Sequence, residues 1–111
     1  MLKLNDDGSI ELTRGDTARI TVNITNDTNN SDYVLSNGDT LTLTIKKSTK
    51  DTDILVQKTI NGSNLFHIEP KDTADLEFKK YKYDIQLSTE SGDVFTVVGP
   101  YDFKITEEVT Y

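Results

Sequence analysis

Apolar and polar side chains alternate with a period of two along several short stretches of this sequence. Residues 18–25 show the pattern first, and it returns near residues 41–45, 81–87 and 101–105. Successive side chains of a β-strand point to opposite faces, so each stretch predicts a strand with one apolar and one polar face. Such strands bury their apolar faces only against one another, which predicts an all-β sandwich or barrel.

The residues on the apolar parity form the predicted core. They are Ile20, Val22, Leu41, Leu43, Ile45, Phe66, Ile68, Ile85, Leu87, Phe103 and Ile105. We expect the strands that carry them to form a predominantly antiparallel sandwich of two sheets.

Turn-forming residues separate the stretches at intervals typical of a β-sandwich, for which we expect about seven to nine strands. The expected strands cover residues 9–12, 18–25, 40–47, 54–60, 64–69, 80–88 and 94–98, with a last strand that ends near Glu107. Asn61-Gly62 predicts a tight hairpin between residues 54–60 and 64–69. Residues 90–93 predict a second hairpin, and Gly99-Pro100 should bend the chain into the last strand.

One short helical turn is expected near residues 72–76. Asp72 is a good capping residue there, and Asp75 is the acid three positions later. Pro70 should end the preceding strand because it has no N–H to donate. With 111 residues, the chain is expected to hold a flexible N-terminal arm at residues 1–7 and a single sandwich domain at residues 8–111.

Composition narrows the function classes. The chain has no cysteine, which excludes disulfides and thiolate chemistry. Its formal net charge of −7 argues against nucleic acid as a partner, because phosphate affinity comes from clustered cations. The sequence shows neither a signal peptide nor a membrane span, so we expect synthesis in a reducing cytoplasm and no membrane partner.

Four patterns resemble functional motifs, and each has a stronger structural interpretation. Arg14-Gly15-Asp16 matches an integrin-binding tripeptide, but it lies where a turn launches a strand and glycine supplies positive φ. Asp27, Asn29 and Ser31 have the spacing that begins a calcium loop, but the sixth and twelfth positions lack the Gly and the bidentate Glu that an EF-hand needs. His67 has no second His or Cys in the sequence with which to form a catalytic or metal site. Acid pairs such as Asp72 with Asp75 show no sign of one acid held protonated and one held ionised, as glycoside hydrolysis requires. We therefore expect no catalytic, metal-binding or cofactor-binding residues, no cofactor and no enzyme activity.

Residues 94–98 are apolar on both parities, with Val94, Phe95, Val97 and Val98. Two interpretations stay open. One face of this strand is covered by a neighbouring subunit or by the N-terminal arm, or the strand is central and fully covered within its own fold.

Tyr81 is expected to have a structural role. The order Asp72-Thr73-Ala74, Leu76, Tyr81 and Tyr83 resembles the entry to strand F of immunoglobulin-like domains, where a tyrosine hydroxyl pins the corner. Tyr81 also shares parity with Tyr83, Ile85 and Leu87, so its ring should be buried. Because a buried phenol needs a hydrogen-bond partner, we expect its hydroxyl to bond a backbone carbonyl between Asp72 and Glu77.

The whole chain, from about Leu12 to Thr110, resembles immunoglobulin-like structural proteins of phages and prophages of Gram-positive bacteria, including the N-terminal domain of baseplate upper proteins. The motifs that carry the resemblance are Arg14-Gly15-Asp16-Thr17, residues 41–47, residues 66–73, residues 81–87 and residues 103–110. It implies an immunoglobulin-like antiparallel β-sandwich and a non-enzymatic tail, baseplate or head accessory protein. It also implies a place in the virion after synthesis in the host cytoplasm, other virion structural proteins as partners, and self-association into a homo-oligomer.

Two other function classes stay open. A carbohydrate- or cell-surface-binding module uses the same sandwich, but it commonly presents Trp or Tyr platforms, and this chain has no Trp. A small hydrolase ranks third, because it needs a nucleophile or acid–base site that the sequence does not show.

Overall fold

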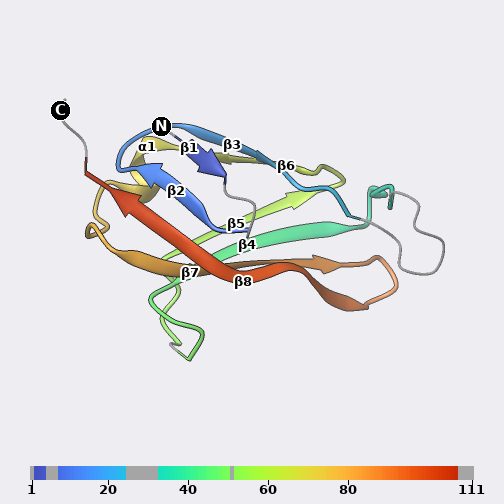
Figure 1. The fold of residues 1–111 in the computed structure, drawn as a ribbon. Coiled ribbons are helices and arrows are strands. Elements are labelled where there is room, and N and C mark those ends of the chain that lie inside the picture. Colours follow the sequence, from blue (N-terminus) through green and yellow to red (C-terminus); the bar gives the residue numbers. More distant parts are fainter. Residues whose placement is uncertain (1, 5–7, 25–32, 51, 108–111) are drawn as a thin grey trace.

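The computed structural model describes residues 2–4, 8–24, 33–50 and 52–107, and shows an all-β sandwich with one short helix (Figure 1). The elements in chain order are β1 (Leu2–Leu4), β2 (Ile10–Thr13), β3 (Ala18–Thr21), β4 (Thr40–Lys46), β5 (Val56–Asn61), β6 (Leu65–Ile68), α1 (Pro70–Thr73), β7 (Lys80–Ser88) and β8 (Val94–Thr106). The eight strands found in the described residues lie within the predicted range.

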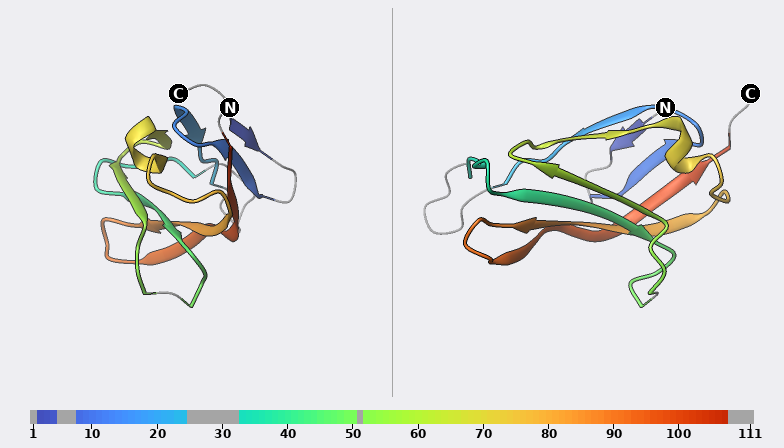
Figure 2. Two further views of the ribbon diagram at one scale, coloured as in Figure 1. Left: turned by 90° about the vertical axis from the view of Figure 1, so that its left-hand side faces the viewer. Right: turned by 180° about the vertical axis from the view of Figure 1, so that it is seen from behind.

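The strands form two sheets of unequal size. The larger has the order β1-β2-β8-β7-β4-β5, and the smaller pairs β3 with β6. Every neighbouring pair is antiparallel except β2 and β8, which run parallel. Seen end-on, the larger sheet curls around the smaller one (Figure 2). The core therefore lies between the curled sheet and the β3–β6 pair.

The predicted core is confirmed. β4 alternates buried and half-buried side chains along its whole length, as does most of β7. All the predicted core side chains are buried, and they are joined by Ile10, Leu12, Ala18, Val56, Tyr81 and Tyr83. Burying a side chain of the size of Leu or Phe stabilises a fold by about 1.5–3 kcal/mol, so this cluster dominates stability.

The predicted hairpin between residues 54–60 and 64–69 is wrong. β5 pairs with β4, whereas β6 pairs with β3 in the other sheet. Gly62 does adopt the expected positive φ of 60°, and its N–H donates to the carbonyl of Asp39 at 2.9 Å. Asn61-Gly62 signals a reversal of the chain but not which strands pair, and here the chain crosses between sheets.

The bend predicted at Gly99-Pro100 lies inside one strand. β8 continues from Val94 to Thr106, and its register with β7 shifts where Tyr83 and Ile85 face it. Gly99 has φ of 86°, and a Cβ there would approach the carbonyl oxygen of Tyr83 to 2.7 Å. A bulge thus turns the strand without ending it. The Gly99–Pro100 peptide bond is cis.

The helical turn begins two residues earlier than predicted. α1 has Pro70 at its first position, and the amide of Glu69 donates to the Asp72 carboxylate at 2.7 Å. Asp72 therefore closes a capping interaction with Glu69 and does not start the turn. Proline is favoured at this position because its fixed φ suits a helix.

The predicted N-terminal arm contains a strand. Leu2–Leu4 pair antiparallel with β2, with Leu2 opposite Leu12. Residues 1 and 5–7 of that arm lie outside the described residues.

Leu43→Ala should lower the free energy of unfolding by about 2–5 kcal/mol, because it leaves a cavity at a fully buried site between β5 and β7. Urea denaturation measures the change. Gln86→Ala, at an exposed site on β7, is the matched control and should change stability by less than about 0.5 kcal/mol. Equal effects of the two substitutions would contradict the assigned core.

Candidate functional site

The Arg14-Gly15-Asp16 segment is tied into the fold. Gly15 has the expected positive φ, at 84°, and its N–H donates to the buried hydroxyl of Thr73 at 2.9 Å. The Arg14 guanidinium lies 4.2 Å from the centroid of the Phe78 ring, and it donates to the carbonyl of Leu76 at 3.5 Å. These contacts hold the turn against α1 and the segment that follows it, which favours the structural interpretation.

The remaining motif residues form no cluster in the described part of the chain. His67 is exposed on β6, opposite Arg19 of β3. Asp27, Asn29 and Ser31 lie outside the described residues. Among those that are described, no group of three or more His, Asp or Glu side chains is placed to hold a metal ion, and no helix is long and apolar enough to span a membrane.

Tyr81 pins the corner as predicted. Its ring is buried, and its hydroxyl donates to the carbonyl of Glu77 at 2.9 Å. The hydroxyl of Tyr83, two residues along the same face of β7, donates to the carbonyl of Gly8. The two phenols thus fix the loops before β7 and before β2 to the core.

Asp39 joins the connection before β4 to the turn between β7 and β8, at the opposite end of the sandwich. Its buried carboxylate accepts hydrogen bonds from the amide of Ser36 at 3.1 Å, the hydroxyl of Tyr33 at 2.8 Å and the amide of Glu90 at 3.2 Å. The Ser36 and Tyr33 bonds are the main causes that hold the pKa of Asp39 below its usual value, and the bond to Asp39 raises the pKa of Tyr33. The sequence predicted a turn at residues 36–39, but nothing in it showed which distant amides the carboxylate would meet.

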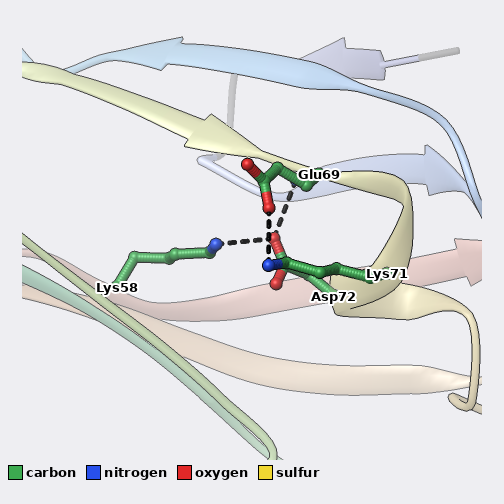
Figure 3. A network of polar contacts seen from close by, with 4 residues as sticks. All are labelled: Lys58, Glu69, Lys71 and Asp72. Carbon is green, nitrogen blue, oxygen red and sulfur yellow. Dashed lines mark hydrogen bonds and ion pairs between the residues drawn. The ribbon is translucent and has the colours of Figure 1, made fainter.

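A charged network closes one side of the sandwich (Figure 3). Lys58 on β5 lies opposite the buried Leu43, so it faces inward, and its Nζ lies 2.8 Å from the carboxylate of Asp72 in α1. Lys71 pairs with Glu69 beside it at 3.1 Å. Because β5 belongs to the larger sheet and α1 follows β6 of the smaller one, the Lys58–Asp72 pair links the two sheets. The pair could not be predicted from the sequence, because Lys58 lies on β5 and Asp72 in α1, and the local pattern does not show that these elements pack together.

The exposed apolar residues of β8 are the strongest candidate for an interaction surface. Val94 is 60% exposed and Phe95 is 53% exposed, whereas Val97 and Val98 are half-buried. The interpretation of residues 94–98 as a strand fully covered within its own fold is therefore wrong. The described residues leave part of it open to solvent.

This stretch also lies along the margin of the larger sheet (Figure 1). β8 pairs with β7 from Val94 onward, but β2 joins it only from Phe103 to Thr106. Among the described residues, no strand pairs with the other side of residues 94–98. We call these residues the open edge of β8.

A hollow of about 330 Å³ lies on the outer, polar face of the same sheet. Its lining includes Thr44, Lys46, Gln57 and Gln86, together with Ile54 from the connection between β4 and β5. Lys82, also in the lining, is paired with Asp102. The hollow offers mixed hydrogen-bonding groups for a polar ligand.

Comparison with known proteins identifies no relative: no protein-family model, curated protein or solved structure matches this chain. The function of the chain is therefore inferred from its own sequence and surface.

Tyr81→Phe should lower the free energy of unfolding by about 0.5–1.5 kcal/mol, the net value of one hydrogen bond, and leave the oligomeric state unchanged. Thermal and urea denaturation measure it. Tyr101→Phe removes the same hydroxyl from a side chain that is 41% exposed and serves as the control. A Tyr81→Phe protein as stable as the wild type would show that the bond to Glu77 contributes nothing.

Stability should also depend on the ionisation of Asp72. Partial burial raises the pKa of Asp72. The hydrogen bonds from Lys58 and from the Glu69 amide lower that pKa by more than burial raises it, so it lies below the ordinary 3.8. The ion pair therefore stabilises the fold fully above pH 3.8 and is lost as pH falls through the lower folded-state pKa.

Asp72→Asn should accordingly lower the free energy of unfolding by about 1 kcal/mol at neutral pH. This difference from wild type should shrink in acid, because the wild-type carboxyl is then also neutral. Urea denaturation across a pH series measures it, and the ionisation of Asp39 cancels because both proteins carry it. Asp75→Asn, at an exposed acid beside α1, is the control. A difference that persists unchanged at the lowest pH would contradict an electrostatic role.

Proposed function

We propose that this chain is a non-enzymatic structural protein that acts through protein–protein contacts in a phage or prophage virion. The observation that carries the proposal is the open edge of β8, where Val94 and Phe95 are exposed on a strand with an unpaired side among the described residues. Exposed apolar side chains on such an edge are typical of a surface that another protein covers.

The virion setting comes from the resemblance of the sequence to immunoglobulin-like phage structural proteins. An all-β sandwich with short strands and polar connecting loops is compatible with that setting. In this role the protein contributes shape and contact surface to a tail, baseplate or head.

Phage particles test the proposal directly. Particles from a strain that carries the gene, purified on a density gradient, should contain this chain in a fixed ratio to the major capsid protein by quantitative mass spectrometry. An abundant host cytoplasmic protein measures contamination, and particles from a strain lacking the gene provide the blank. Absence of the chain from wild-type particles, or its presence only at the level of the host protein, would contradict the virion role.

A carbohydrate- or cell-surface-binding module is the second candidate, and the polar hollow over β4 and β7 favours it. Its lining offers hydroxyl and amide groups from Thr44, Gln57 and Gln86. The one aromatic side chain in that lining, Tyr83, is buried and presents no open ring to a sugar. Saturable glycan binding by the wild type that Gln57→Ala weakens and Val94→Ala leaves intact would support this candidate.

A further inference from the structure

The larger sheet protects one of its margins with charge. β5 is the last strand of the sheet, and its inward-facing Lys58 is only 25% exposed because it reaches across to Asp72. A charged side chain that points inward from an edge strand opposes the docking of another strand, because docking would remove the charge from its remaining contact with water. β5 is therefore a poor site for strand addition.

The open edge of β8 carries no such protection. All its side chains, from Val94 to Val98, are uncharged, and three of them, Val94, Phe95 and Thr96, are exposed. Its ends are defined by Asp93 in the hairpin turn and by Pro100, which has no N–H for a ladder. The backbone groups on this side of the stretch, to which no described strand pairs, form a template for one more strand.

The composition of the open edge fits a second copy of itself. Antiparallel pairing about Thr96 sets Val94 opposite Val98 and Phe95 opposite Val97, and no register within the stretch sets like charges opposite one another. The chain as a whole carries a net charge of −7, so two copies repel over most of their surfaces. A neutral, apolar segment is where two copies approach at the lowest electrostatic cost, and a two-fold axis brings the same segment from each.

We propose that a second copy of this chain pairs with the open edge of β8, antiparallel and through the same residues 94–98, so that the two larger sheets join across a two-fold axis. The pairing adds a neighbour on the unpaired side of β8 and covers Val94 and Phe95. It rests on the proposed function and deepens it, because it identifies the protein that covers the exposed apolar side chains.

Light scattering after size exclusion, over a concentration series of the full chain, tests the pairing. The wild type should form dimers as concentration rises. Thr96→Lys should raise the dimer dissociation constant at least about tenfold, because two lysines then meet near the axis. Gln86→Lys adds the same charge directly opposite Thr96, but on β7, which has a partner on both sides, and should leave the dimer intact. Both sites are exposed, and circular dichroism verifies that each variant folds.

Hydrogen exchange followed by mass spectrometry provides the second measurement. Backbone amides of residues 94–98 should become more protected as the wild-type concentration rises, while those of β5 should not change. A wild type that stays monomeric at every concentration, or a dimer that Gln86→Lys disrupts as strongly as Thr96→Lys, would overturn the proposal.

These results are independent of the particle analysis. A monomeric chain that is nevertheless present in particles in a fixed ratio would overturn the self-pairing and leave the virion role standing. If Thr96→Lys then abolished incorporation into particles, a strand of another virion protein would be the occupant of the edge instead.

Discussion

The change of neighbours along β8 is the constraint on which the rest of the structure depends. Among the described residues, its first half pairs with β7 alone, whereas β2 joins its other side from Phe103 to Thr106. The bulge at Gly99-Pro100 separates the two halves and lets the strand turn while it stays paired with β7. This turn brings Phe103 and Ile105 beside Ile10 and Leu12, which extends the core to β2. The same turn leaves residues 94–98 at the margin of the sheet.

Sequence predicted the buried faces well because burial follows from a local pattern. The alternation around Leu43 and Ile85 determines which side chains point inward, whichever strands become neighbours. The same argument placed the Tyr81 hydroxyl near the turn that precedes its strand, since both lie close together in the chain. Pairing partners were harder to predict: Asn61-Gly62 marks a reversal equally well in a hairpin and in a crossing between sheets. The candidate surface was visible only as a choice between two interpretations. A stretch that is apolar on both parities indicates equally a strand with one face covered by a neighbouring subunit or the N-terminal arm, and a central strand covered within its own fold.

The polar residues that organise the sandwich could not be predicted because their partners are remote. Asp39 binds the Glu90 amide, 51 positions away, and Gly15 binds the Thr73 hydroxyl, 58 positions away. Each of these two hydrogen bonds lies at an end of the sandwich, where loops from several strands converge and backbone amides lose their contact with water. A carboxylate or hydroxyl there satisfies groups that would otherwise be costly to bury. These residues secure the loops, whereas the apolar alternation secures the sheets.

β5 and the open edge of β8 lie at different margins of the larger sheet, and they differ in how they treat charge and apolar surface. At β5, Lys58 occupies a position whose neighbours along the inner face, Val56 and Ile60, are apolar, and it is accommodated because Asp72 lies 2.8 Å away. The pair links the two sheets and also makes the edge unfavourable for another strand. At β8, Val94 and Phe95 remain in water, an arrangement that costs free energy in an isolated chain and that burial against another strand would recover. That difference between β5 and the open edge, more than any single side chain, supports the proposed contact with another protein at β8.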